Sequence, residues 1–139
     1  MQNTVTGCAC LFNRSAADLA FPIPSAAMEH DRWLALNVHW FGYIAALPLI
    51  LVKYRQHNKN QIGASQKIKS VSQSVAAWSQ QAEVFLLRYA DQFNECERAY
   101  LNDFASLHRK NRWQRRKILW KNKIRKQGFL PNIALLAVP

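Results

Sequence analysis

The longest apolar stretch of the chain is an uncharged run at residues 33–52, with the sequence WLALNVHWFGYIAALPLILV. A helix rises about 1.5 Å per residue, so twenty uncharged residues cover the hydrocarbon core of a bilayer, which is about 30 Å thick. Charged residues close both ends of the run, and aromatic side chains lie near the ends, where they suit the membrane interface. The pattern predicts a single transmembrane helix over residues 31–56.

Three residues weaken this prediction. Asn37 and His39 place polar groups in the early turns of the run, and Pro48 removes a backbone donor near its far end. The alternative is a central hydrophobic helix of a small soluble bundle. A histidine inside a span raises the question of a proton-transfer or cofactor role, but near a helix end it more often hydrogen-bonds a neighbouring helix or a lipid headgroup. We therefore expect no such role for His39.

A second apolar pattern, with hydrophobic residues every three or four positions, runs from Ile68 to Leu107. This spacing places the apolar side chains on one face of a helix. Neither glycine nor proline interrupts residues 64–127. The pattern therefore predicts one long amphipathic helix over residues 67–127, with a basic C-terminal end. Residues 57–66 are mostly polar and are expected to form a linker or a continuation of the membrane helix.

Large aromatic side chains recur along the apolar face of this long helix. They are too bulky for a simple two-stranded coiled coil, whereas an irregular surface built from several proteins accepts them more readily. We expect them to bind another protein; the alternative is that other parts of the same chain cover them. The predicted partner-binding residues are Trp78, Phe85, Tyr89, Phe93, Tyr100 and Phe104.

The segment at residues 108–126 holds ten lysines and arginines and no acidic residue, with tryptophan and aliphatic side chains interleaved. Such a helix can neutralise RNA phosphates while its indoles stack on bases. It can equally lie on an anionic membrane surface, or be a solvated face that packs on a partner through its few apolar residues. The predicted lipid or nucleic-acid phosphate contacts are Arg109, Lys110, Arg112, Arg115, Arg116, Lys117, Lys121, Lys123, Arg125 and Lys126.

The two ends of the chain lack helical periodicity. Prolines at positions 22 and 24 oppose a regular helix there, so residues 1–30 are expected to form an extended arm. After Gly128, which can end a helix, the chain closes with a short apolar tail that carries no charged side chain. This tail, residues 128–139, is too short to span a bilayer and is expected to dock in a groove or an interface.

The charge of the chain is uneven. Its 139 residues carry a formal net charge of +11. Residues 1–32 contain two basic and three acidic side chains, whereas residues 53–139 contain seventeen basic and five acidic ones. Because basic residues next to a span are retained on the cytoplasmic or matrix side, we expect the C-terminal region on that side. A basic surface also suits anionic lipid or nucleic acid as a partner.

Candidate catalytic and metal-binding chemistry is sparse. The three cysteines, Cys8, Cys10 and Cys96, are an odd number and do not suggest the disulfide framework of a small secreted protein. The Cys8-x-Cys10 pair could bind a metal or form a redox couple, but no further ligands lie nearby in the sequence. The four histidines match no HExxH signature, and the glycines form no phosphate-binding loop. The sequence therefore predicts no enzyme activity, cofactor or metal.

Together these features predict an all-α chain with a single transmembrane helix, a long amphipathic helix, an extended N-terminal arm and a short apolar C-terminal tail. Because such linear apolar strips cannot be buried by the chain alone, we expect a non-catalytic, single-pass accessory subunit, structural or for assembly, of a large membrane protein complex. The expected location is the mitochondrial inner membrane, in an energy-converting respiratory-chain complex, with the C-terminal region on the matrix side. The alternative is a basic RNA- or ribosome-associated protein that acts through residues 109–126.

Overall fold

The computed structural model describes residues 5–53, 55 and 71–124, and every regular element within them is helical. In chain order the elements are η1 (Gly7–Ala9), α1 (Arg14–Ala20), α2 (His30–Phe41), α3 (Val71–Arg88), η2 (Ala90–Gln92), α4 (Glu95–Ala105), η3 (Leu107–Arg109) and α5 (Arg112–Lys121), where η denotes a short 3-10 helix. The all-α prediction is thus confirmed for these residues. None of the helices in the described ranges has both the length and the apolar character needed to cross a membrane.

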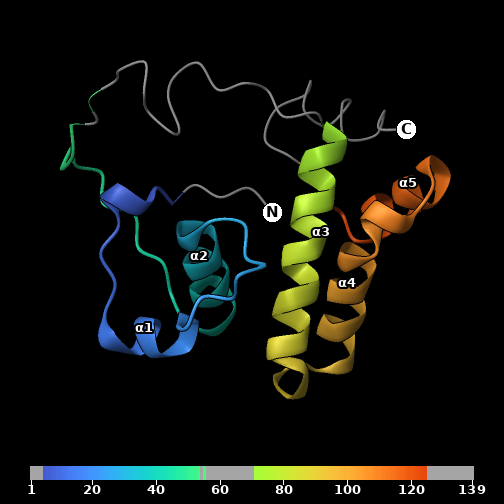
Figure 1. The fold of residues 1–139 in the computed structure, drawn as a ribbon, viewed down its shortest axis with the longest axis horizontal. Coiled ribbons are helices and arrows are strands. Elements are labelled where there is room, and N and C mark those ends of the chain that lie inside the picture. Colours follow the sequence, from blue (N-terminus) through green and yellow to red (C-terminus); the bar gives the residue numbers. More distant parts are fainter. Residues whose placement is uncertain (1–4, 54, 56–70, 125–139) are drawn as a thin grey trace.

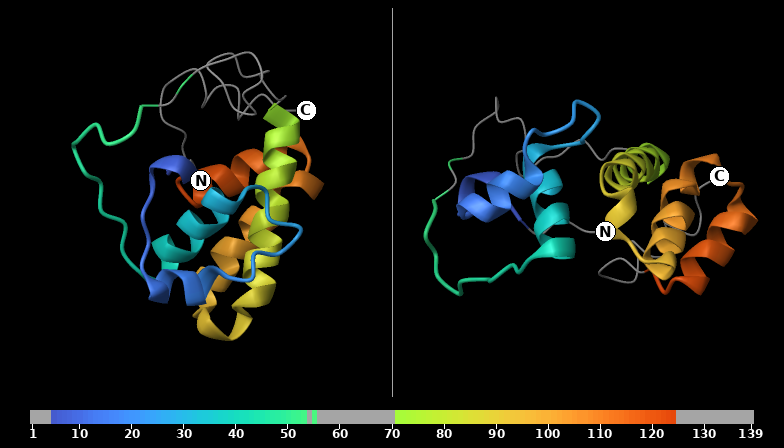
Figure 2. Two further views of the ribbon diagram at one scale, coloured as in Figure 1. Left: turned by 60° about the vertical axis from the view of Figure 1, so that its left-hand side comes forward. Right: turned by 90° about the horizontal axis from the view of Figure 1, so that it is seen from below.

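Helix α3 lies at the centre of the molecule, with α1 and α2 on one side and α4 and α5 on the other (Figure 1). α3 and α4 form an antiparallel pair connected through η2, and α1 packs against α2. η3 follows α4, contacts α3 and leads into α5. The view from below in Figure 2 shows the same order of helices across the molecule. The fold therefore has two contact regions, one on each side of α3.

The first contact region, here called the aromatic core, joins α1 and α2 to α3 and the start of α4. Phe85 of α3 is fully buried there, and its ring centroid lies 5.9 Å from that of Trp33 and 5.1 Å from that of Tyr89. Aromatic pairs in such geometries contribute about 0.5–1.5 kcal/mol each beyond their buried area. The buried members of the aromatic core are Ala20, Trp33, Leu34, Leu36, Phe85, Tyr89, Phe93 and Leu101.

The second contact region holds α5 on the pair formed by α3 and α4. Leu119 is the buried residue of α5, and Ile118 and Ile124 are partly buried beside it. Trp78 of α3 packs against the same cluster. The buried members of this second core are Val75, Ala82, Phe104, Ala105, Leu107 and Leu119.

Trp33, Asn37 and Tyr89 carry polar groups in the aromatic core that are hydrogen-bonded, as most buried polar groups are, whereas the buried indole Nε1 of Trp40 has no hydrogen-bond partner among the described residues. The indole Nε1 of Trp33 donates to the carbonyl of Ala20 over 2.8 Å. Asn37 is fully buried; its Nδ2 donates to the Trp33 carbonyl over 2.7 Å, and its Oδ1 contacts the Tyr89 hydroxyl. The same hydroxyl lies 2.6 Å from the carbonyl oxygen of Leu19. These bonds fix α1 and α2 to the end of α3.

Helix α2 ends at Phe41, so the predicted continuous helix over residues 31–56 is wrong for the described residues. The N–H of Gly42 donates to the Val38 carbonyl over 2.9 Å, and residues 42–53 form no helix. Glycine disfavours a helix by about 1 kcal/mol relative to alanine, and Pro48 lacks the N–H that a helix interior requires. The large apolar side chains of α2 are instead buried or partly buried in the aromatic core, which explains the hydrophobic first half of the run.

The predicted single helix over residues 67–127 is also wrong, because the described part of that range forms α3, α4 and α5. Asn94 starts α4 with a reciprocal cap: its Oδ1 accepts from the Glu97 N–H over 2.9 Å, and Glu97 Oε2 accepts from the Asn94 N–H over 3.0 Å. Asn111 and Gln114 repeat this arrangement at the start of α5. Such capping boxes satisfy N–H groups that have no partner within the helix, and they make a new helix start favourable.

The N-terminal arm is not extended throughout, because α1 occupies part of it. Asn13 caps α1 by accepting from the Ala16 N–H over 2.9 Å, and Arg14 pairs with Asp18 over 2.8 Å, one turn further on. The proline-containing stretch at residues 21–24 is not helical, as expected. The predicted linker at residues 57–66 and the predicted apolar tail at residues 128–139 lie outside the described residues.

Candidate functional site

The predicted partner-binding aromatics lie mainly inside the protein. Phe85, Tyr89 and Phe93 are buried in the aromatic core and Phe104 in the second core. Trp78 and Tyr100 are half-buried and pack at the edges of these clusters. For the four buried residues, the structure agrees with the alternative that other parts of the same chain cover the aromatic side chains. Their aromatic surface is therefore occupied within the chain and does not form an open docking face.

The two tyrosines of this stripe respond to their surroundings as buried phenols do. Burial raises the pKa of Tyr89 above its ordinary value, and the positive charge and hydrogen bond of Arg88 partly oppose this rise. Burial also raises the pKa of Tyr100. Both side chains therefore stay neutral at physiological pH and act in packing and hydrogen bonding.

The basic segment has an inward stripe on α5 that binds the rest of the chain. Residues four and three apart lie on one face of a helix, so Arg115, Leu119 and Asn122 form this stripe. Leu119 is buried, and Arg115 Nε donates to the Leu107 carbonyl over 2.9 Å. Nearby, Arg109 pairs with Glu83 of α3 at 2.5 Å. These two predicted phosphate-binding arginines therefore have partners within the protein.

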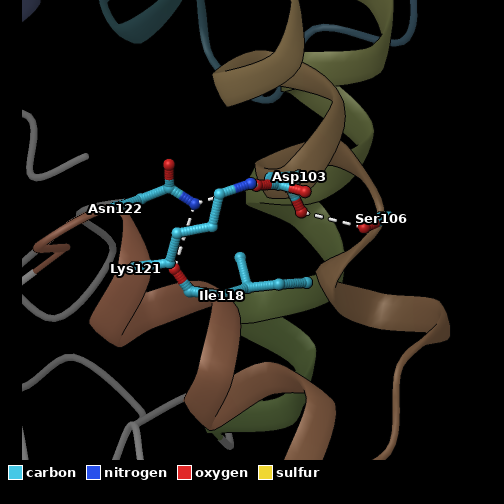
Figure 3. Close-up of polar contacts among 5 residues, drawn as sticks. All are labelled: Asp103, Ser106, Ile118, Lys121 and Asn122. Atoms are coloured by element: carbon cyan, nitrogen blue, oxygen red, sulfur yellow. Dashed lines mark hydrogen bonds and ion pairs between the residues drawn. The ribbon is translucent and has the colours of Figure 1, made fainter.

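Asp103 of α4 receives the far end of α5 (Figure 3). Figure 3 shows Lys121 and Asn122 pointing toward its carboxylate; Lys121 Nζ lies 2.8 Å from Asp103 Oδ2, and Asn122 Nδ2 donates to the same oxygen over 3.1 Å. Burial alone would raise the pKa of Asp103, but the hydrogen bonds from Lys121 and Asn122 and the charges of Lys121 and Lys110 lower it below its ordinary value. The carboxylate thus clamps α5 and fixes which of its faces points outward.

The outward stripe of α5, here called the tryptophan face, consists of Trp113, Arg116, Lys117 and Trp120. Trp113 is 71 % exposed and Trp120 is 87 % exposed. The guanidinium carbon of Arg116 lies 5.6 Å from the centroid of the Trp113 ring, which is cation–π geometry. Lys117 is exposed between the two indoles. The sequence predicts phosphate contacts for the basic residues of this stripe, and it predicts that the indoles stack on RNA bases or lie at a membrane surface.

The other predicted phosphate contacts are spread around α5. Arg112 and Lys123 are exposed, and Lys110 is half-buried. Lys123 adopts a positive φ of 51° just after the helix, a conformation that is uncommon outside glycine and asparagine. Arg125 and Lys126 lie outside the described residues. The eight predicted contacts within the described residues therefore do not form one continuous face.

A second candidate surface is the apolar segment, defined as residues 43–52. It leaves α2 and arches along the side of the molecule away from α3 (Figures 1 and 2). Ile50 is 93 % exposed and Leu47 is 66 % exposed; the other large exposed apolar side chains are Tyr43, Ile44, Leu49, Leu51 and Val52. The signal for its loss of helical structure was in the sequence, at Gly42 and Pro48. Its exposure could not be foreseen, because a transmembrane helix also accounts for an apolar run.

The candidate redox and metal chemistry stays dispersed. Cys8, Cys10 and Cys96 are free thiols; Cys8 and Cys96 are exposed, and the Cys10 Sγ lies 3.3 Å from the Gly7 carbonyl oxygen. His39 is exposed at the end of α2. Across residues 5–53, 55 and 71–124, no group of three or more His, Cys, Asp or Glu side chains could hold a metal ion.

The two exposed surfaces thus differ in chemistry: one is apolar and without regular structure, and the other is a rigid helix face with indoles and cations. Neither can be interpreted through a relative, because no protein-family model, no curated protein and no solved structure matches the chain.

Proposed function

We propose that the protein is a non-catalytic accessory subunit of a larger protein assembly, and that the apolar segment attaches it to a neighbouring subunit. The exposure of this segment is the observation that carries the proposal. Its large side chains project into solvent, while those of α2, immediately before it, are buried or partly buried in the aromatic core. Contiguous exposed apolar surface of this kind is typical of contacts with other proteins or with membranes.

The backbone of the apolar segment favours a protein as its partner. Residues 43–53 form no helix, so their N–H and C=O groups lack the internal hydrogen bonds of a helix. In hydrocarbon each unsatisfied backbone group would cost several kcal/mol. A protein groove or sheet edge can supply the missing hydrogen bonds while its pockets receive alternate side chains. The apolar segment therefore suits a protein interface better than the bilayer core.

The membrane part of the proposal rests on the sequence alone. The charge asymmetry between residues 1–32 and 53–139 favours an assembly at a membrane with the C-terminal region on the cytoplasmic or matrix side, and the mitochondrial inner membrane stays a prediction. A span over residues 33–52 would compete with the aromatic core, because Trp33, Leu34 and Leu36 would have to leave Phe85. Attachment through the apolar segment leaves this core intact.

The alternative, a basic RNA-associated protein acting through residues 109–126, has weaker support. Arg109, Arg115 and Lys121 already bind a carboxylate or a carbonyl of the same chain. Nucleic-acid affinity depends strongly on the number of cations that contact phosphates. Engagement of these side chains inside the protein reduces that number.

The proposal is tested by replacing two apolar side chains of the apolar segment with carboxylates. In the source organism, the tagged Leu47→Asp/Ile50→Asp variant is expected to disappear from the high-mass assembly that the wild-type protein joins on a native gel. Loss of interface anchors commonly costs about 2 kcal/mol or more each, which corresponds to at least about thirtyfold weaker binding. The purified variant should unfold at the same temperature as wild type, because both leucine and isoleucine project into solvent.

Leu87→Asp is the matched control, because Leu87 is also exposed, at 75 %, but lies on α3. This variant should remain in the assembly. Equal incorporation of the Leu47→Asp/Ile50→Asp variant and the wild-type protein would exclude the apolar segment as the attachment site. Release of both variants by nuclease at physiological salt would instead support the RNA-associated alternative.

A further inference from the structure

The tryptophan face is a second exposed surface, separate from the apolar segment. Trp113, Arg116, Lys117 and Trp120 are separated by three, four and seven positions, so they share one stripe of α5. At about 1.5 Å per residue, the two indoles lie roughly 10 Å apart along the helix. Tryptophan is one of the more buried residue types, and two that are largely exposed on one stripe of a short helix indicate a binding surface.

The charge around these indoles is positive. Lys117 is exposed and Arg116 is half-buried on the same stripe, and no acidic residue follows Asp103 in the sequence. Asp103 itself is engaged with Lys121 and Asn122. A partner that fits this face must accept indole rings and must carry negative charge next to the sites where the rings bind.

We propose that the tryptophan face binds the surface of a bilayer that contains anionic phospholipids. Indoles favour the headgroup region, where their rings contact acyl chains and their N–H groups remain hydrated. Arg116 and Lys117 then lie close to lipid phosphates, with their aliphatic stems along the apolar boundary. The rest of α5 stays on the protein through Leu119 and the Asp103 clamp, so the helix binds at the surface and does not insert.

Two observations favour a bilayer over single-stranded RNA. The Arg116 guanidinium already covers one face of the Trp113 ring, at 5.6 Å, which leaves less of that ring for base stacking. An indole that lies at the membrane interface does not need a ring face free for stacking. The two tryptophans also rise from one stripe of a helix that α4 holds in place, so both can meet a flat surface at once.

The test is flotation of the full-length protein with vesicles of phosphatidylcholine alone or mixed with phosphatidylglycerol. Wild type is expected to float with the mixed vesicles and to remain behind with the neutral ones. Trp113→Ala/Trp120→Ala should reduce the bound fraction at least about tenfold, since each indole removes apolar surface from water on binding. Lys117→Glu should weaken binding at least about fivefold, from about 1 kcal/mol per basic residue near an anionic surface.

Leu87→Ala and Arg14→Glu, which change an exposed leucine of α3 and an exposed arginine of α1, are the controls and should bind like wild type. Leu47→Asp/Ile50→Asp should also keep vesicle binding, so this proposal and the proposed function can fail separately. Circular dichroism of the tryptophan variant should match wild type, and acrylamide should quench wild-type tryptophan fluorescence less when mixed vesicles are present.

Vesicle binding that survives the Trp113→Ala/Trp120→Ala substitution would overturn the proposal, as would equal binding to neutral and mixed vesicles. A single-stranded RNA oligonucleotide that binds through the same residues, in a protein that mixed vesicles fail to float, would overturn it in favour of nucleic acid.

Discussion

Single polar side chains decide how the apolar surfaces of this protein meet. Asn37 lies inside an uncharged run, yet it is fully buried because the Trp33 carbonyl and the Tyr89 hydroxyl satisfy it. Asp103 plays the corresponding role for α5 through Lys121 and Asn122. Each polar residue fixes the position of one helix relative to another. Apolar contact alone would not determine this position.

Asp103→Asn is expected to lower the free energy of unfolding by about 1 kcal/mol or less at pH 7, because Lys121 is largely exposed and water screens the pair. The folded-state pKa of Asp103 lies below its ordinary value, so its carboxylate stabilises the fold fully above that ordinary value, near pH 4. This stabilisation is lost as the pH falls through the lowered pKa. The difference in the free energy of unfolding between wild type and the variant, measured by urea unfolding, should therefore become smaller in acid.

Asp91→Asn is the matched control for the loss of one carboxylate, since Asp91 is exposed in η2. A gap between wild type and Asp103→Asn that is equally large at pH 7 and in acid would show that the carboxylate charge does not hold α5. Substitution of Lys121 by methionine should have an effect similar to that of Asp103→Asn and should add little to it, because both changes remove the same ion pair.

At the scale of the helices, the sequence contains signals for where α4 and α5 begin, but the regular apolar spacing predicts one continuous helix across them. The Asn94 to Glu97 and Asn111 to Gln114 spacings are capping-box signatures. The short η2 and η3 turns keep the three-and-four apolar rhythm nearly in phase, so periodicity alone extends one helix across both breaks. Residue spacing therefore predicted the helical class and the apolar stripe, but not that the chain itself covers most of this stripe, and the caps were needed to predict the helix lengths.

Asn94→Ala and Asn111→Ala are expected to lower the free energy of unfolding by about 1 kcal/mol each, as loss of an N-cap does. The sign of this effect distinguishes capped helices from one continuous helix. In a continuous helix the same substitutions would stabilise the protein by about 0.5 kcal/mol, because alanine has the higher helix propensity. Chemical unfolding followed by circular dichroism measures the difference.

Asn102→Ala is the control, because Asn102 is exposed in the interior of α4. It should leave stability unchanged or raise it slightly. Stabilisation by all three substitutions would mean that α3, α4 and α5 are one helix in solution. Aspartate at position 94 or 111 should retain most of the wild-type stability, because its carboxylate can also accept from the backbone N–H groups.

For the whole molecule, composition and periodicity predicted an all-α chain but not the division of its most apolar run. The first part, in α2, is buried under α3, and residues 43–52 are exposed. Asn37 and Tyr89 are 52 positions apart, and no local pattern predicts that contact. The exposure of Trp113 and Trp120 likewise depends on which face of α5 packs on α4. Both candidate surfaces therefore follow from tertiary contacts.

Cleavage at a protease site introduced within residues 56–70 is expected to leave two fragments that co-elute in gel filtration. The aromatic core takes Trp33, Leu34 and Leu36 from one fragment and Phe85 and Tyr89 from the other. The guanidinium of Arg88 in the second fragment also donates to backbone carbonyls of the first, those of Leu19, Phe21 and Pro22. The uncleaved protein with the same site is the control. Separate elution of two unfolded fragments would contradict this expectation.

Such a cut would turn the aromatic core into a bimolecular interface with its own dissociation constant. The stability of the cleaved protein would then depend on its concentration, whereas that of the intact chain would not. Comparison of the stability of the intact chain with that of the cleaved protein gives the effective concentration of one half of the chain around the other. This effective concentration is of about millimolar order for short connections. A dissociation constant well below this value would mean that the two halves of the chain recognise each other as separate molecules do.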